Sequence, residues 1–337
     1  MQFGVMDHLD LSGDGSVHEH YENRLKLLEL YDRGGFRGYH VTEHHCTPLG
    51  GGASPSVFLA AAAQRTQRLR LGTLVYALPT HHPIRLAEEI GMIDQMSNGR
   101  VDLGFGRGSV PMELAYFGLD PSKARNLHEE ALECVLQGLA TGRIDFSGTY
   151  FKIKDAPIFQ RPAQTPHPPI WYGVHSLESA ERAAHRAYHI VCNEPASDSR
   201  AYIDMFKSTW RRRNGDAPLP VIGLARSVFV ATTDAEALRV ARRAHLKFNA
   251  SFRYLHNRHG VVPRLSGREA TFDEMIASGR ATAGTPRTVA RSLESDMRTA
   301  GADYCVMRLA FGDMSFAEME HSVKLFISEA APLLNAD

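Results

Sequence analysis

Residues 99–108 read Gly-Arg-Val-Asp-Leu-Gly-Phe-Gly-Arg-Gly, a short apolar run followed by glycines around one arginine. Apolar residues at alternate positions in Val101–Phe105 predict a buried strand. Glycines allow the backbone to turn sharply and to approach a ligand closely. Arg107 offers a planar fork of donors that suits phosphate. The stretch therefore predicts a phosphorylated cofactor at the carboxyl end of a parallel strand.

Outward from this stretch, short apolar runs alternate with segments of helical spacing along the whole chain. We expect strands near residues 2–6, 39–44, 69–78, 101–107, 170–175, 189–193, 221–231 and 303–311. We expect helices near 21–34, 55–66, 84–96, 122–140, 177–187, 199–212, 234–250, 286–300 and 315–330. Eight strands alternating with helices predict an α/β fold, the closed (β/α)8 TIM barrel. An open doubly wound sheet is the alternative, but no Gly-x-Gly-x-x-Gly motif follows the first strand.

Two segments interrupt the alternation. Residues 143–169 begin with a strand-like pattern and then become rich in proline, which predicts a small inserted hairpin or loop. Residues 251–285 form a long polar stretch, and a loop of that length in a compact domain is typical of a functional segment. We expect it to be a mobile lid over the barrel mouth. No repeat or linker divides the chain, so residues 1–337 are expected to form one domain.

Composition limits the classes of function. The 337 residues include 38 Lys and Arg and 38 Asp and Glu, a formal net charge of zero. This balance argues against nucleic acid or an acidic membrane surface as the main partner. The 4 cysteines contain no Cys-x-x-Cys pair, which indicates free thiols in a reducing compartment. No apolar run reaches the length of a membrane span and the first residues are strand-like, so a cytoplasmic location is expected.

Titratable and phosphate-binding groups follow several of the expected strands, which in a barrel end at one rim. Glu43, His44 and His45 follow the second strand, and His81 and His82 the third. Adjacent residues of an extended segment point to opposite faces, so neither histidine pair has the spacing of a metal site. We expect no metal. Taken singly, each of these histidines more often binds loop backbone than carries chemistry.

A phosphate site is predicted at the ends of the fourth and fifth strands. Arg107 ends the fourth strand, and Ser176 and Ser179 follow the fifth, in the first turn of a helix. Serine hydroxyls and free N–H groups at a helix N-terminus favour an anion. Each serine alone is more often a plain helix cap, but joint use with an arginine from the neighbouring strand is consistent with phosphate binding.

Longer stretches around these residues resemble the bacterial luciferase-like flavin-dependent monooxygenase family. The stretches that carry the resemblance are Glu43–His45, Gly72–Val75, Leu78–Glu88, Asp94–Arg100 and Ala283–Pro286, and their order and spacing match as well. The resemblance covers nearly the whole chain. It implies a (β/α)8 barrel that holds reduced FMN, on which O2 forms a C4a-peroxyflavin that oxidises a small organic substrate. It also implies a separate NAD(P)H:flavin reductase, since no reductase domain is visible.

The resemblance also implies roles for individual residues. Arg107, Ser176 and Ser179 would hold the FMN phosphate, a cis peptide bond between Leu74 and Val75 would lie under the flavin ring, and Gly106 and His175 would lie beside the cofactor. His44 would be the catalytic base or proton donor, with His45, Glu43 and Glu113 as its neighbours. The helices after the second and third strands, which include His82 and Glu88, would form a homodimer interface.

Two departures from the luciferase α subunit bear on chemistry. Gly106 replaces a cysteine next to the flavin, which we expect to open space there, and His175 replaces an acidic residue. An F420-dependent oxidoreductase that transfers hydride on the same barrel is an alternative, and so is a non-catalytic flavin-binding protein. The sequence leaves the substrate open, and with it the choice among hydroxylation, Baeyer–Villiger oxidation and C–S cleavage.

Overall fold

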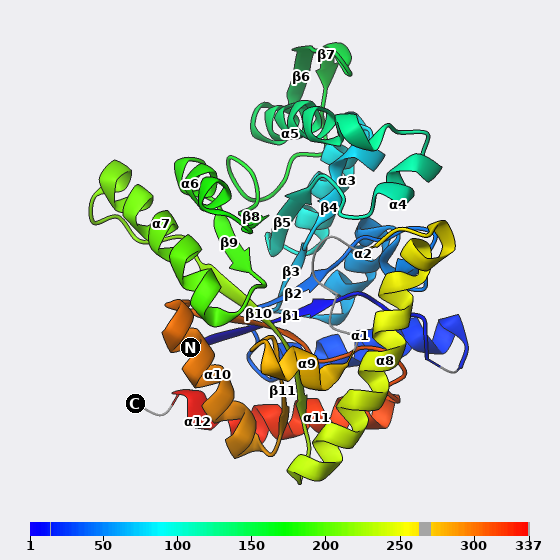
Figure 1. The fold of residues 1–337 in the computed structure, drawn as a ribbon. Helices are drawn as coiled ribbons and strands as arrows, with labels where there is room; N and C mark the ends of the chain where they lie inside the picture. Colours follow the sequence, from blue (N-terminus) through cyan, green and yellow to red (C-terminus); the bar gives the residue numbers. More distant parts are fainter. Residues whose placement is uncertain (14, 263–270, 336–337) are drawn as a thin grey trace.

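A closed ring of eight parallel strands forms the centre of the protein (Figure 1). The computed structural model describes residues 1–13, 15–262 and 271–335. The ring comprises β1 (Gln2–Asp7), β2 (Gly38–Val41), β3 (Arg70–Thr73), β5 (Val101–Gly106), β8 (Ile170–Gly173), β9 (His189–Cys192), β10 (Ile222–Val230) and β12 (Tyr304–Arg308). It closes because β10 pairs in parallel with β9 as well as with β12. Closure confirms the TIM barrel and rules out the open doubly wound sheet.

Helices surround the ring and follow most of its strands. They are α1 (Val17–Arg33), α2 (Pro55–Arg65), α3 (Pro83–Met96), α4 (Pro111–Tyr116), α5 (Ala124–Thr141), α6 (Leu177–His185), α7 (Ala196–Asn214), α8 (Asp234–His259), α9 (Phe272–Ala277), α10 (Pro286–Ala300), α11 (Phe316–Leu325) and α12 (Ala331–Asn335). One-turn segments lie at Gly50–Gly52, Leu78–Thr80, Pro121–Lys123 and Phe326–Ala330. In the described part of the chain, no helix combines the length and the apolar character needed to cross a membrane.

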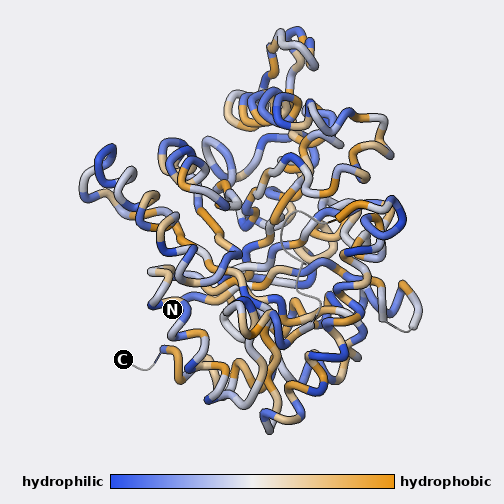
Figure 2. Tube along the Cα trace, in the orientation of Figure 1, coloured by the Kyte–Doolittle hydropathy of each residue, from blue (hydrophilic) through white to orange (hydrophobic). Residues whose placement is uncertain are grey.

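The helices are amphipathic, as the mixed colouring of the outer layer in Figure 2 shows. In α10, Val289, Leu293, Met297 and Ala300 recur at spacings of three and four and are all buried, so one face packs on the barrel. Thr285 caps this helix by accepting a hydrogen bond from the Thr288 N–H. Periodicity and caps of this kind account for the agreement between the expected and observed helices.

The expected hairpin region contains β6 (Arg143–Ser147) and β7 (Lys152–Pro157), which pair antiparallel. Figure 1 shows this pair projecting from the barrel beside α5. A two-residue strand, β4 (Tyr76–Ala77), pairs with the end of β5 and extends the rim near the candidate site.

The prediction that residues 251–285 form a continuous loop is wrong for the part that the structure describes. α8 continues through this region to His259, because Phe248, Phe252 and Leu255 keep helical spacing and pack inward. Farther along, α9 and a strand, β11 (Ala281–Gly284), follow, and β11 pairs with the end of β10. Residues 263–270 of the expected lid lie outside the described residues. Closure of a lid over the mouth stays a prediction.

Candidate active site

The carboxyl ends of the barrel strands meet at one rim, which we call the barrel mouth. The segment after β2 brings Glu43, His44 and His45 there, the segment after β5 brings Arg107, and the segment after β8 brings His175 and Ser176. Because β2, β3, β5 and β8 are consecutive around the ring, these groups follow one another along the rim. The barrel thus gathers residues that are far apart in sequence.

His44 and Glu113 form a buried pair at this mouth. His44 Nδ1 lies 3.0 Å from Glu113 Oε1, and the two residues are only 8% and 4% exposed. Glu113 lies in the first turn of α4, so the segment after β5 supplies the carboxylate that meets the histidine after β2. An ionised carboxylate accepts the Nδ1–H and leaves Nε2 as the available nitrogen. The pair has the arrangement of a general base and its orienting group.

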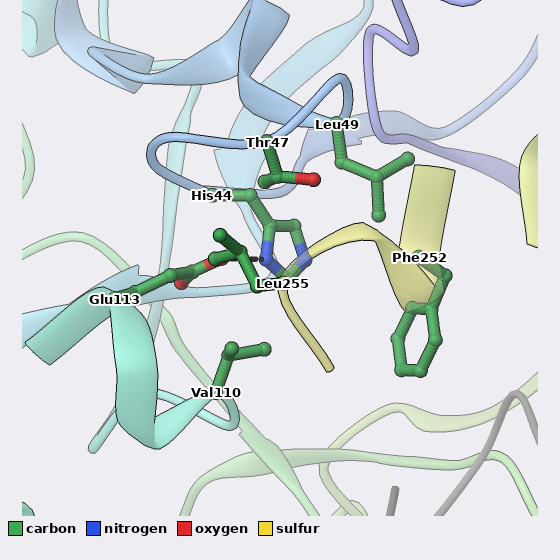
Figure 3. Close-up of a pocket in the computed structure, with 7 residues that line it drawn as sticks. All are labelled: His44, Thr47, Leu49, Val110, Glu113, Phe252 and Leu255. Atoms are coloured by element: carbon green, nitrogen blue, oxygen red, sulfur yellow. Dashed lines mark hydrogen bonds and ion pairs between the residues drawn. The ribbon is translucent and has the colours of Figure 1, made fainter. Parts of the chain in front are cut away.

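The other nitrogen of His44 faces an apolar pocket. Figure 3 shows the imidazole between Glu113 on one side and Phe252 on the other. The pocket is lined by His44, Thr47, Leu49, Val110, Glu113, Phe252 and Leu255. The last two belong to α8, so this helix supplies an apolar wall against the imidazole. Sequence reasoning missed this wall because it ended the helix near residue 250. The spacing of Phe248, Phe252 and Leu255 was the available signal.

Glu43 and His45 form a second, separate network. Glu43 Oε1 lies 2.8 Å from His45 Nε2 and 2.9 Å from His81 Nε2, and Glu43 Oε2 accepts the Ala77 N–H at 3.0 Å. Burial alone would raise the pKa of Glu43, but the hydrogen bonds from His45 and His81 lower it to about 2. The charged carboxylate ties the segment after β2 to that after β3.

His44 and His45 therefore have different partners, which agrees with the prediction that adjacent side chains of an extended segment point to opposite faces. The four residues expected to act together are divided into two pairs, of which His44 with Glu113 lines the pocket. Within the described residues, no group of three or more His, Cys, Asp or Glu side chains has the arrangement of a metal site.

The residues expected to hold phosphate lie at the ends of neighbouring strands. β5 pairs in parallel with β8, so Arg107 and Ser176, which follow these two strands, lie at the same end of the barrel. Arg107 is exposed and forms no ion pair with any residue in the described ranges. Its guanidinium is free to take an external anion.

Ser176 and Ser179 cap α6 in a reciprocal arrangement. The Ser176 hydroxyl accepts the Ser179 N–H at 3.2 Å, while the Ser179 hydroxyl accepts the N–H groups of His175 and Ser176. Both serines thus serve as the plain cap that is the common role of such residues. The helix N-terminus and the exposed Ser176 still face the same rim as Arg107. His175 beside them is paired with Glu194, Nδ1 to Oε1, at 2.7 Å.

The peptide bond between Leu74 and Val75 is cis, as the resemblance implied. Val75 lies against Gly106, where a Cβ atom would come within 2.4 Å of Val75 Cγ2. The expectation that Gly106 opens space is therefore wrong in this structure, because the Val75 side chain occupies that space. Gly104 is required for a different reason, because a Cβ atom there would come within 2.1 Å of the Thr73 carbonyl oxygen.

Comparison with known proteins finds similar monooxygenases by a family model, among relatives and among solved structures. A family model described as luciferase-like monooxygenase matches residues 1–304. Protein y4wF of Sinorhizobium fredii, uncharacterized, is 38% identical over 315 residues, which cover 93% of this chain and 92% of the relative. The oxygenase component of the flavin-dependent trigonelline monooxygenase of Acinetobacter baylyi is 26% identical, covering 80% of this chain and 77% of that relative.

Among solved structures, the monooxygenase RslO1 from Streptomyces bottropensis matches with a TM-score of 0.88 and 26% identity, over 98% of this chain and 99% of that one. An F420-dependent secondary alcohol dehydrogenase matches with a TM-score of 0.74 and 17% identity, over 99% of both chains. At that level of identity the second likeness shows the fold alone.

Proposed function

Because this chain belongs to the luciferase-like monooxygenase family, we propose that it is an FMN-dependent monooxygenase of a two-component system. It would receive reduced FMN from a separate reductase and use O2 to oxidise a small organic substrate. Reduced FMN supplies the electrons that activate O2. The observation that carries the proposal is the buried pair of His44 and Glu113 beside an apolar pocket, on the same rim as the exposed Arg107.

The residues at the ends of β5 and β8 are suited to an FMN phosphate. Arg107 offers a guanidinium with no competing ion pair among the described residues, and the N-terminus of α6 offers N–H groups and the Ser176 hydroxyl. The segments that would border the ring are Leu74 and Val75, with Gly106 and His175 alongside. The cradle of backbone at Gly104 and Gly106 leaves no room for larger residues without displacing neighbours.

His44 is the proposed base or proton donor. Glu113 would hold the imidazole with Nδ1 protonated, so that Nε2 is the nitrogen that exchanges a proton with a substrate at the barrel mouth. Phe252, Leu255 and Val110 would exclude water from that nitrogen. Glu43 and His45 would act by fixing the segment that carries His44.

The proposed homodimer has support at the surface. Val57 on α2 is 71% exposed, and Met92 and Met96 on α3 are 52% and 46% exposed. α2 and α3 pack side by side after β2 and β3, so these apolar side chains belong to neighbouring helices. Exposed apolar side chains that gather on adjacent elements are typical of protein interfaces.

A cytoplasmic location remains part of the proposal.

The proposed function is tested by binding and by oxygen reactivity. Under argon, FMNH2 is titrated into the protein, and the complex is then mixed with oxygenated buffer in a stopped-flow spectrometer. A monooxygenase gives a long-lived flavin absorbance, distinct from that of oxidised FMN, which decays faster when a substrate is added. An F420-dependent oxidoreductase binds reduced F420 in preference to FMNH2 and transfers hydride without consuming O2. Rapid reoxidation with stoichiometric peroxide, unaffected by any compound, would indicate a non-catalytic flavin-binding protein.

A further inference from the structure

Beside His44, the same side of the barrel mouth carries His8, Phe248 and Arg308, none of which was expected in the site. His8 directly follows β1, Arg308 is the last residue of β12, and Phe248 lies on α8. β1 pairs with both β12 and β2. His8, Arg308 and His44 therefore come from three consecutive strands of the ring.

A continuous row of contacts joins Arg308 to His44. The His8 ring stacks on the His44 ring, with centroids 5.8 Å apart and planes inclined by 12°. Phe248 meets His8 edge-on at 5.1 Å, and the Arg308 guanidinium lies 4.1 Å from the Phe248 ring centre. Since His44 also contacts Glu113, one row of side chains extends from β12 to α4.

Arg308 carries a charge in this row without a counter-ion. Within residues 1–13, 15–262 and 271–335, it forms no ion pair or hydrogen bond, and its Nε is buried without a partner. Burial and the nearby Arg280 lower the pKa of Arg308 to about 10, so the group remains a cation at neutral pH. The contact with Phe248 accepts none of its N–H groups. Arg308 is partly buried. A cation withdrawn from water is normally paired, so an unpaired guanidinium here is suited to an anionic ligand.

Asp7 and Asp10 are the carboxylates that act electrostatically on Arg308, and both already have other partners. Asp7 accepts the Tyr39 hydroxyl and pairs with Arg24. Asp10 accepts hydrogen bonds from Ser12 and from the Gly312 N–H. Neither reaches the Arg308 guanidinium with a hydrogen bond. The chain therefore leaves these donors available to a ligand.

His8 adds a neutral polar group beside this cation. Burial, then the charges of Arg308 and His44, hold the pKa of His8 well below its usual value, so the imidazole is neutral. Its Nδ1 is buried without a hydrogen-bond partner. His8 Nδ1 is thus a second polar atom of this row without a partner among the described residues.

The ring order separates Arg308 from the proposed phosphate site. From β12, the strands follow as β1, β2, β3 and β5, so β12 and β5 lie on opposite sides of an eight-stranded ring. β2, which leads to His44, lies halfway between them. An anion at Arg308 and a phosphate at Arg107 would face each other across the mouth, with His44 between.

We propose that Arg308, assisted by His8, binds a carboxylate of the substrate and thereby directs the reactive part of that molecule toward His44. The substrate class is a small organic acid. The inference rests on the proposed function only for the statement that the opposite side of the mouth holds the flavin. Guanidinium and carboxylate form paired, charge-assisted hydrogen bonds, which a neutral amide of the same shape cannot match.

The test compares matched acids and amides on the full chain: benzoate with benzamide, and hexanoate with hexanamide. Calorimetric titration at constant ionic strength and pH 7 is expected to show each acid binding at least about 10-fold tighter than its amide, as for one charge-assisted hydrogen bond. Arg308→Met is expected to weaken the acids by about 10- to 100-fold and the amides by less than about 2-fold. Arg308→Lys should give an intermediate preference. Arg242→Met, at an exposed arginine of α8 paired with Asp273, is the matched control and should change neither.

Three results would overturn the proposal: equal binding of acid and amide by the unaltered protein, an unchanged preference in Arg308→Met, or loss of FMN affinity instead of acid affinity in that variant. The last would assign Arg308 to the flavin phosphate. If Arg308→Met does not fold, the unaltered protein and Arg308→Lys decide the question. Absence of FMN binding together with a retained acid preference would contradict the proposed function and leave this inference standing.

Discussion

At the scale of single residues, His44 decides whether the site performs proton transfer. We expect His44→Ala to bind reduced FMN normally and to lose about 10²- to 10⁴-fold in the rate of substrate oxidation, the usual contribution of a general acid or base. Oxygen consumed without transfer should appear as hydrogen peroxide. The ratio of product to peroxide, measured per O2 consumed, checks this.

The matched control for that experiment is His185→Ala, since His185 is exposed at the end of α6 and does not line the pocket. It should retain full product yield. Glu113→Gln keeps the size of the orienting side chain but removes its charge, so its product yield should fall between those of the other two variants. An undiminished yield in His44→Ala would mean that the imidazole is only structural.

The variant Arg107→Ala tests the proposed phosphate site. We expect Arg107→Ala to weaken the binding of reduced FMN by about 1.5–3 kcal/mol, because a charge-assisted hydrogen bond to the phosphate is lost. Anaerobic titration followed by fluorescence or absorbance measures the change. Arg143→Ala, at an exposed arginine on the β6–β7 hairpin, is the control and should bind like the unaltered protein. Equal flavin affinity in the two variants would remove Arg107 from the phosphate site.

Glu43 links the site to stability. Because its pKa falls from 4.5 to about 2 on folding, its ionised form is preferred in the native state, and the stabilisation is present above the unfolded pKa. We expect Glu43→Gln to unfold about 3 kcal/mol more easily at pH 7, from about 1.4 kcal/mol per pKa unit. The deficit should shrink as the pH falls from about 4.5 toward 2, where the unaltered protein loses its advantage. Urea unfolding of both proteins at pH 7, 5, 4 and 3 tests this, and a deficit independent of pH would contradict it.

At the scale of elements, the sequence was sufficient to predict all eight strands of the ring, because β-branched and apolar runs between helical segments identify them. It did not predict β11, whose residues Ala281–Gly284 are small and lack the pattern of a strand. They pair with the end of β10, a contact for which the local sequence carries no signal. His8 also lacks a local signal, because no motif surrounds it in the sequence and its contact with His44 forms only in the folded barrel.

At Gly106, the last residue of β5, a neighbouring side chain limits the size of the residue that fits. A methyl group at this position in β5 would overlap the Val75 side chain, which approaches from the segment just before β4. We expect Gly106→Ala to destabilise the protein by about 1–3 kcal/mol, the usual cost of overpacking. Val75→Ala in the same chain should recover most of that loss, since it removes the atoms that are in contact. Thermal and urea unfolding of the two single variants and the double variant measure the coupling. Additive effects would show that Val75 is not the obstacle.

At the scale of the whole molecule, the order of the strands decides how the site is divided. Arg107 follows β5 and Arg308 is the last residue of β12, and these two strands lie on opposite sides of the ring. The sequence placed Arg107 correctly after a strand, but the opposition of the two arginines depends on barrel closure, which no single segment encodes. The proposed phosphate site and the proposed carboxylate site can therefore be tested with separate variants.

The surface of the assembled barrel leads to the last prediction, which concerns association. If α2 and α3 form the interface, sedimentation should give a mass of about twice 37.3 kDa. Met92→Glu should shift the protein toward the monomer, because it places a charge one turn from the exposed Met96 on the same face of α3. Leu246→Glu, at a 57% exposed leucine of α8, is the control and should stay dimeric. A monomeric unaltered protein at micromolar concentration would contradict the interface, and a dimer unaffected by Met92→Glu would mean that another face associates.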